Sequence, residues 1–252
     1  MSKISSGIAV LAIILIPILD WWVIADHNHR LAWALTAALM LLFIIATGQT
    51  IIGRWAGILI DDRNVISLSR FQMTVWTVIL LSAYVTAALY NIYTGVDEPL
   101  AIGILKELWL AMGISTASLV GTPMILAPKK AKMASEPELQ ATLTQLAREG
   151  QPPSNTKAVG QVIGNTSPSL ASWSDMFTGD ETSNGAHVDL AKVQMFFFTL
   201  AITVSYCFAL WRTFRYAQPD GITQFPALDE STLALLGISH SGYLVNKAVP
   251  RN

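Results

Sequence analysis

Residues 68–87 read LSRFQMTVWTVILLSAYVTA, and residues 190–209 read LAKVQMFFFTLAITVSYCFA. Each stretch is apolar over about the 20 residues that an α-helix needs to cross a bilayer, and the two share a basic residue, Gln-Met, a threonine and a tyrosine in the same order. The pairs matched at an offset of 122 are Leu68 and Leu190, Arg70 and Lys192, Gln72 and Gln194, Met73 and Met195, Thr77 and Thr199, Tyr84 and Tyr206, and Ala87 and Ala209. The match predicts two related membrane-spanning helices.

The similarity extends beyond these two stretches. Gly113-Ile114-Ser115 recurs as Gly237-Ile238-Ser239 at an offset of 124, and an acidic pair followed by an asparagine precedes each copy. These acidic groups are Asp61, Asp62 and Asn64, and Asp180, Glu181 and Asn184. We therefore predict a duplicated helical hairpin. Because an even number of spans separates the copies, both hairpins would cross in the same direction, around an approximate two-fold axis along the membrane normal.

The composition is typical of a membrane protein. Only 13% of the 252 residues are charged, against about 25% in soluble domains, and the mean hydropathy is +0.47. Six apolar blocks are long enough to span a bilayer, and the last is more polar than the others. They cover residues 7–25, 32–52, 72–93, 108–127, 193–211 and 231–249. The blocks predict an all-α membrane protein with six spans.

The first block has some features of a cleaved signal peptide. Lys3 precedes it, and Val23-Ile24-Ala25 would suit cleavage, but Asp20, Trp21 and Trp22 do not suit the end of a signal sequence. We therefore predict a retained first helix.

The basic residues predict the orientation. With the N-terminus inside, twelve lie on the cytoplasmic side and four outside, as the positive-inside rule requires. The twelve are Lys3, Arg54, Arg63, Arg70, Lys129, Lys130, Lys132, Arg148, Lys157, Lys192, Lys247 and Arg251; the four are Arg30, Lys106, Arg212 and Arg215. Most tryptophans also fall at the ends of spans, where their rings prefer the headgroup region. Both termini are expected in the cytoplasm of a bacterial-type inner membrane.

The spans and loops divide the chain into four segments: an N-terminal hairpin over 1–53, a first repeat over 54–127, a cytoplasmic loop over 128–187, and a second repeat over 188–252. The loop opens with Lys129, Lys130 and Lys132. We expect these lysines to contact anionic lipid headgroups, at about 1 kcal/mol per cation, or to act only as determinants of topology.

The loop also contains one predicted helix. Ser135 is a candidate N-cap with Glu138 three residues later, and Gly150 follows the predicted end. Leu139, Leu143 and Leu146 would share one face, which must cover a neighbouring subunit or the membrane surface. The stretch from Pro152 to Ser169 is rich in Pro, Ser, Asn and Gly, and is expected to be a linker without room for a second core.

Several polar and small residues within the spans have two interpretations. Gly113, Ala117 and Gly121, with Gly237 and Ser241, favour close helix packing, or else line a pathway. Thr77 with Tyr84, and Thr199 with Tyr206, lie on one helix face in each copy and would form interhelical hydrogen bonds or line the same pathway. Gln72 and Gln194 lie just inside the cytoplasmic boundary, where a gate would be, although an amide is also easily solvated there.

Two ionisable residues fall within or near the predicted hydrocarbon region, where such groups are costly and often functional. They are Asp20, which could instead reach the outer interface, and His240, a candidate for proton or ion sensing.

Metal-binding and catalytic chemistry have little support. The candidate metal ligands are Asp61, Asp62, Asn64, Asp180, Glu181 and Asn184, whose oxygen atoms suit calcium or magnesium. Because no spaced, glycine-containing EF-hand loop is present, helix capping or salt bridges to Arg63 and Arg70 explain these residues better. His27 and His29 could form only a weak surface metal site. The chain has one cysteine, Cys207, and no nucleotide-binding or hydrolase motif, so we expect neither a cofactor nor an enzyme.

Three stretches resemble a family of bacterial multi-pass inner-membrane proteins. They are residues 61–72 (DDRNVISLSRFQ), 188–199 (VDLAKVQMFFFT) and 235–244 (LLGISHSGYL). The resemblance extends over most of the chain and implies an inner-membrane location, but it transfers no catalytic or binding residue.

We therefore expect a non-enzymatic, homo-oligomeric membrane protein, embedded in the lipid bilayer, that conducts or gates a small ion between the repeated hairpins. The alternative is a membrane anchor or scaffold that docks a cytoplasmic protein through residues 128–187, and an intramembrane enzyme ranks third. The net charge of -1 gives no indication of nucleic-acid binding.

Overall fold

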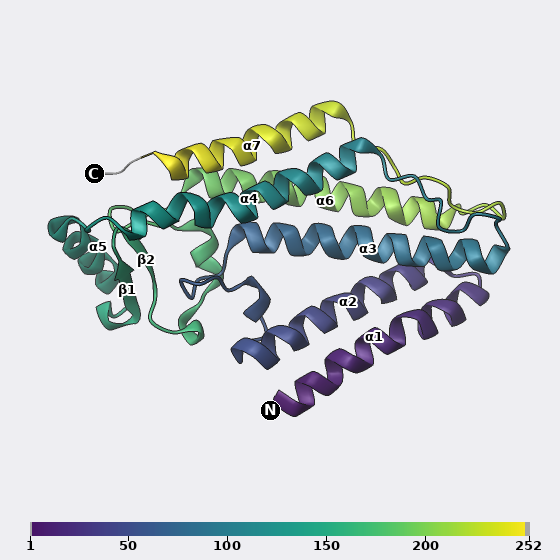
Figure 1. The fold of residues 1–252 in the computed structure, drawn as a ribbon, viewed down its shortest axis with the longest axis horizontal. Helices are drawn as coiled ribbons and strands as arrows, with labels where there is room; N and C mark the ends of the chain where they lie inside the picture. The colour runs from purple at the N-terminus through teal and green to yellow at the C-terminus, as the bar shows by residue number, and fades with distance from the viewer. Residues whose placement is uncertain (1, 250–252) are drawn as a thin grey trace. The chain divides into compact units, whose positions relative to one another are not determined.

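The computed structural model describes residues 2–249, of which residues 2 and 3 are described by their backbone alone. The side chain of Lys3, and Arg251, therefore lie outside the described residues. The described chain is mainly helical (Figure 1), and its α-helices are α1 (Ser2–Ala25), α2 (His29–Ile52), α3 (Leu68–Thr94), α4 (Lys106–Lys130), α5 (Glu136–Arg148), α6 (Leu190–Arg215) and α7 (Glu230–Ala248).

Five of these helices are long and apolar enough to cross a membrane, namely α1, α2, α3, α4 and α6. The first five predicted spans are thus confirmed as long apolar helices, and the chain is a multi-pass membrane protein. Helix α7 is a helix of 19 residues, but its hydropathy does not place it with the other five.

The chain forms two compact units. Unit 1 comprises Met1–Ile58, Thr74–Met112 and Leu200–Leu233, and unit 2 comprises Leu59–Met73, Gly113–Thr199 and Ala234–Asn252. Helices α3, α4 and α6 contribute residues to both units.

Unit 1 begins with the hairpin of α1 and α2 (Figure 1). The turn between them places His27 at a φ of 56°, and the side chain of Asn28 caps α2 by accepting a hydrogen bond from the Leu31 amide at 3.4 Å. Much of α1 is exposed although it is strongly apolar, with side chains such as Ile4 and Val10 more than half exposed. An apolar surface of this kind suits contact with lipid.

Asn91 of α3 organises the loop between α6 and α7 within unit 1. Its Nδ2 donates to the Ile222 carbonyl at 3.0 Å, and its Oδ1 accepts from the Ile222 amide at 2.7 Å. Gly221 adopts a φ of 94°, and a Cβ there would press against the Asn91 amide at 2.7 Å. The same loop pairs with the loop between α3 and α4 through a parallel bridge between Gly103 and Gln224.

The segment expected to be a linker folds within unit 2. Strands β1 (Thr156–Val159) and β2 (Val162–Asn165) form an antiparallel hairpin, which turns at Gly160 with a φ of 56°. Val162 and Ile163 are buried. The linker prediction is therefore wrong here, because two apolar residues in a short hairpin provide a small core that composition alone does not reveal.

Helix α5 lies where the sequence predicts it, from Glu136 to Arg148, with Ser135 at the N-cap. The Ser135 side chain makes no capping hydrogen bond. Leu146 is buried, and the Thr142 hydroxyl donates to the Thr182 carbonyl at 2.7 Å. The face that was expected to cover a neighbouring subunit or the membrane is thus covered in part by the chain itself, while Leu139 and Leu143 are half-buried.

Candidate functional site

Asp180 is the centre of a buried cluster of charges in unit 2. Its Oδ1 accepts hydrogen bonds from Arg63 Nη1 at 2.5 Å and from Lys192 Nζ at 2.9 Å, and its Oδ2 pairs with Lys247 Nζ at 2.7 Å. The four side chains are at most 8% exposed. One carboxylate therefore joins the loop before α3, the start of α6 and the end of α7.

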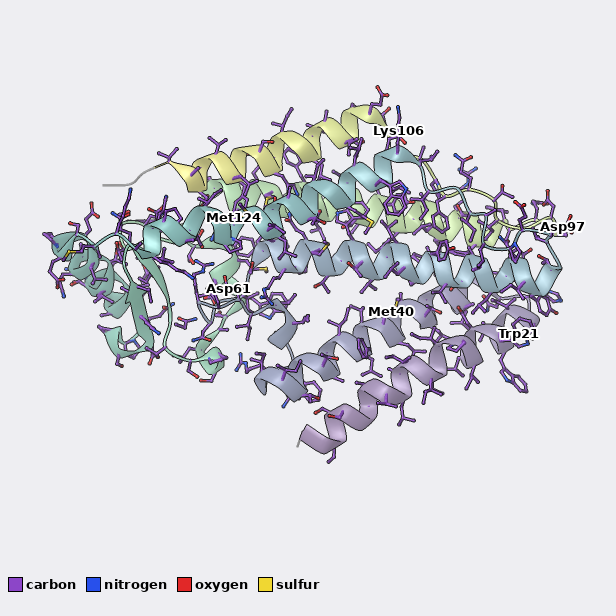
Figure 2. The ribbon with its side chains drawn as sticks, in the orientation of Figure 1. Trp21, Met40, Asp61, Asp97, Lys106 and Met124 are labelled. Carbon is purple, nitrogen blue, oxygen red and sulfur yellow. The ribbon has the colours of Figure 1, made fainter. Side chains whose placement is uncertain are left out.

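The charges in this cluster shift the pKa values of its members. Burial alone would raise the pKa of Asp180, but Lys192, Lys247 and Arg63 outweigh burial and hold that pKa well below its ordinary value. Burial would lower the pKa of Arg63, but Asp180 and Asp61 raise it. Asp61 contacts the other edge of the guanidinium, with Oδ2 at 2.8 Å from Nη2 (Figure 2 labels Asp61, on the loop before α3). Each buried charge therefore has a partner, as such charges require.

Lys129 forms a second buried ion pair beside this cluster. Its Nζ donates to Glu181 Oε1 at 2.8 Å and to the carbonyls of Lys247 and Val249, at 2.7 and 2.9 Å, at the C-terminal end of α7. These contacts use all three donors of the ammonium group. The prediction that Lys129 binds lipid headgroups is therefore wrong. Lys130 pairs with Asp62, while Lys132 is exposed.

The candidate metal ligands serve the protein itself. Asn64 and Asn165 exchange hydrogen bonds from each side-chain amide to the other's carbonyl, at 2.9 Å. The Asn184 side chain accepts from the Glu181 amide at 2.9 Å. Lys130 lowers the pKa of Asp62. The predicted salt bridge between Asp61 and Arg63 is confirmed, and among the described residues no group of three or more His, Cys, Asp or Glu side chains is arranged for a metal ion.

The charge cluster predicts how unit 2 responds to acid. Because the pKa of Asp180 is lowered from about 3.9 in the unfolded chain, its stabilising contribution is complete above about pH 4 and is lost as pH falls through the folded value. Asp175 has the opposite sign, because burial raises its pKa; its ionisation therefore costs stability as pH rises above about 3.9.

We expect the Asp180 contribution to dominate, since three cations face that carboxylate. The midpoint of thermal unfolding, followed by circular dichroism in detergent, should fall when the pH is lowered from about 5 to about 2. A midpoint that does not change over this range would contradict the assignment of Asp180 as the main acid-sensitive group.

Unit 2 also contains a set of buried polar side chains on α3, α4, α6 and α7. This polar seam consists of Ser69, Gln72, Ser115, Ser118, Thr122, Thr199, Ser239, His240 and Tyr243. Four contacts join different helices across it, and the longest, at 3.5 Å, lies between Ser69 Oγ and Thr122 Oγ1. Gln72 Nε2 donates to Thr199 Oγ1 at 2.6 Å, Ser118 Oγ lies 2.6 Å from His240 Nδ1, and Thr122 Oγ1 lies 3.0 Å from the Tyr243 hydroxyl.

Four polar atoms of the seam are buried without a hydrogen-bond partner: Gln72 Oε1, Ser115 Oγ, Ser239 Oγ and His240 Nε2. More than nine in ten buried backbone groups, and most buried side-chain polar atoms, find a partner in folded proteins. A cluster of unpaired atoms in one unit is therefore a feature that the packing of the chain does not explain.

A groove of about 530 Å³ opens beside the seam between α6 and α7. Its polar lining includes Asn184, His187, Gln194, Ser239 and Asn246. The volume falls in the range of small-molecule sites, about 300–1,000 Å³. Ser239 and Tyr243 belong both to the groove and to the seam, so the groove adjoins the residue that carries one of the unpaired polar atoms.

The structure brings together some of the predicted pathway residues and separates others. Gln72 and Thr199 are in contact, Gln194 lines the groove, and His240 binds Ser118. Tyr84 and Tyr206 instead donate to the carbonyls of Leu100 and Pro226, at 3.4 and 3.3 Å, in the loops after their helices. Thr77 is half-buried in unit 1.

The predicted packing residues fall into two groups. A Cβ on Gly121 would meet Leu244 at 3.4 Å, and one on Gly237 would meet Ile114 at 3.7 Å, which fits close helix packing. Gly113, Ala117 and Ser241 are exposed instead, and a Cβ on Gly113 would meet nothing within 4 Å. On α4 the buried stripe is formed by Ser115, Ser118 and Thr122.

The ion cluster was not recognised as a site in the sequence. Sequence position alone assigns Lys192 and Lys247 to topology, Lys129 to topology or lipid headgroups, and Arg63 to topology or a salt bridge with the acidic pairs. One feature of the sequence does indicate the cluster: four basic residues and the two acidic pairs all lie near the ends of spans, and charges at a membrane boundary can pair with each other as well as with lipid.

No protein-family model, curated protein or solved structure matches the chain.

Proposed function

We propose that the protein is a non-enzymatic membrane protein that passes a small ion, and that the polar seam and the groove of unit 2 form part of its pathway. The observation that carries the proposal is the set of unpaired buried atoms on Gln72, Ser115, Ser239 and His240. Such atoms cost about 1–3 kcal/mol each unless water or an ion satisfies them. The groove adjoins the seam at Ser239 and Tyr243, and in this proposal it is the entrance to the pathway.

The proposal includes the duplication, the sixth span and the orientation predicted from the sequence. Tyr84 and Tyr206, which are equivalent at the offset of 122, each donate to a carbonyl of the loop after their helix. The parallel bridge between Gly103 and Gln224 joins positions 121 residues apart, as expected of two copies around a two-fold axis parallel to the bridged segments. Helix α7 would then be the sixth span, and both termini would face the cytoplasm of a bacterial inner membrane.

Ion flux into liposomes tests the pathway. Purified protein should raise the flux above that of protein-free liposomes, and Gln72→Leu or His240→Leu should lower it about tenfold, because each change removes a polar contact worth about 1–1.5 kcal/mol. Ser241→Ala is the matched control, since Ser241 is exposed on the same helix as His240. Wild-type liposomes that pass no ion would contradict the proposal.

The scaffold ranks second because its docking surface is reduced. The leucine face of α5 is partly buried against the chain itself, with Leu146 only 7% exposed. The observation in its favour is that residues 128–187 contain α5 and the hairpin of β1 and β2, and that Trp173 is 56% exposed. An anchor or scaffold would leave liposomes impermeable and lose its cytoplasmic partner in Trp173→Ala.

An intramembrane enzyme ranks third, although one contact resembles a nucleophile and its base. Ser118 Oγ lies 2.6 Å from His240 Nδ1, within the range of such pairs. Ser118 is fully buried at 0% exposure, so no substrate carbonyl reaches its hydroxyl. A serine-reactive phosphonate that labels Ser118 in the wild type would favour the enzyme over the ion pathway.

A further inference from the structure

Asp20 is a buried carboxyl group in unit 1, near the end of α1. Asp20 is only 1% exposed, so its side chain is enclosed by the protein. The hydroxyl of Thr86, on α3, donates to Asp20 Oδ2 at 2.9 Å. The Thr86 hydroxyl also lies near Thr36 on α2, with 3.4 Å between the two Oγ1 atoms. Thr36 and Thr86 are also at most 1% exposed.

The other oxygen of this carboxyl, Oδ1, is buried without a hydrogen-bond partner. The helices that carry the two threonines also bury small apolar side chains, with Ala32, Ala83 and Ala87 at 0% exposure. The hydrogen bond described for the carboxyl is that from Thr86 to Oδ2.

No basic side chain neutralises the carboxyl among the described contacts. The titratable or charged side chains on α2 and on the part of α3 in unit 1 are His29, Arg30, Tyr84, Tyr90 and Tyr93. His29 packs on Tyr90 with ring centroids 4.4 Å apart, Arg30 lies over Trp211, and Tyr93 contacts Trp21 edge-on. Tyr84 donates to Leu100. None of these contacts involves Asp20.

An ionised carboxylate without a counter-charge is too costly in such a place. The site can hold one positive charge, because it contributes one negative charge and two neutral hydroxyls. A divalent ion would leave a surplus charge in the interior. A hard metal cation also takes about six oxygen ligands, more than Asp20, Thr36 and Thr86 supply. These three residues are at most 1% exposed, so the surroundings do not supply the rest. A proton needs only one oxygen, and the buried Oδ1 has no other partner.

We propose that Asp20, Thr36 and Thr86 form an intramembrane proton-binding site, in which Asp20 is held as a neutral carboxylic acid at neutral pH. The two threonines position the carboxyl, with Thr86 donating to Oδ2. The site is built entirely from unit 1, and it is independent of the ion pathway proposed for unit 2.

Infrared spectroscopy of the protein in bilayers tests the site. The C=O stretch of a protonated carboxyl is distinct from the stretches of a carboxylate, it shifts in heavy water, and it moves to lower frequency when the aspartates carry a ¹³C carboxyl. We expect a ¹³C-sensitive band at neutral pH in the wild type that is lost in Asp20→Asn. Thr86→Val should raise the frequency of the band, because it removes the hydrogen bond to Oδ2.

Two controls assign the band. Asp175→Asn removes a half-buried aspartate whose pKa is raised by burial, and it should leave the band unchanged. Asp20→Glu moves the carboxyl to an unlabelled residue, so the ¹³C shift should disappear even if Asp20→Asn fails to fold. A wild type without the band overturns the proposal. A band that is present in choline chloride and absent in sodium chloride also overturns it, in favour of a sodium ion on the carboxylate.

Discussion

Asp180→Asn is expected to destabilise unit 2 by about 3–5 kcal/mol, the usual cost of removing one partner from a buried ion pair. The asparagine has nearly the same shape, so the loss comes from the charge. Arg63, Lys192 and Lys247 would remain buried, with one carboxylate fewer to neutralise them. Urea unfolding in mixed micelles, followed by tryptophan fluorescence, measures the change.

Asp62→Asn is the matched control for this prediction. Asp62 also pairs with a lysine, Lys130, but the two side chains are 64% and 30% exposed, so water screens the pair. Exposed pairs contribute about 0–1 kcal/mol. If both substitutions had the same small effect, the buried cluster would not stabilise the fold. Adding Lys247→Met to Asp180→Asn should restore part of the loss, because it removes one of the cations left without a partner.

Gly160→Ala is expected to have the second largest effect, about 2–5 kcal/mol. Gly160 has a φ of 56°, which costs a residue with a Cβ about 1–2 kcal/mol. The new Cβ would also press against the backbone carbonyls of Lys130 and Lys132, closer than van der Waals contact allows; overpacking of this kind costs about 1–3 kcal/mol more. The hairpin would have to move away from the end of α4, to which Gln161 donates a hydrogen bond at the Lys129 carbonyl.

Gly150→Ala separates the two causes. Gly150 has a φ of 84°, but a Cβ there would meet nothing within 4 Å, so only the backbone strain remains. Hydrogen exchange of the amides of β2 and the free energy of unfolding should both change more in Gly160→Ala than in Gly150→Ala. Equal effects in the two variants would show that the contact with α4 does not matter.

The sequence predicted the elements that follow from local pattern. Five spans are recognised as continuous apolar blocks of about 20 residues, and helix α5 is recognised by the spacing of its leucines. The hairpin of β1 and β2 was not predicted, because its strands have four residues each and lie in a stretch rich in turn residues. Short strands of this kind are stabilised by their neighbours in the fold and not by their own sequence.

The candidate site was predicted only in part, for a related reason. Gln72, Thr199 and His240 were identified because polar residues within an apolar span stand out. The partnership of Asp180 with Arg63 joins positions 117 residues apart, and no periodicity in the sequence indicates such a pair. Lys129 shows the same limit: its position at a span end predicted contact with lipid, whereas the fold turns the side chain inward to Glu181.

The cluster around Asp180 also bears on the synthesis of the protein. A chain is made from its N-terminus at about 5–20 residues per second, so Arg63, Asp180 and Lys192 leave the ribosome before Lys247 does. The contacts of Asp180 with Lys247, and of Lys129 with the carbonyls of Lys247 and Val249, can form only after α7 has been made. Until then an intermediate carries incompletely paired charges in unit 2.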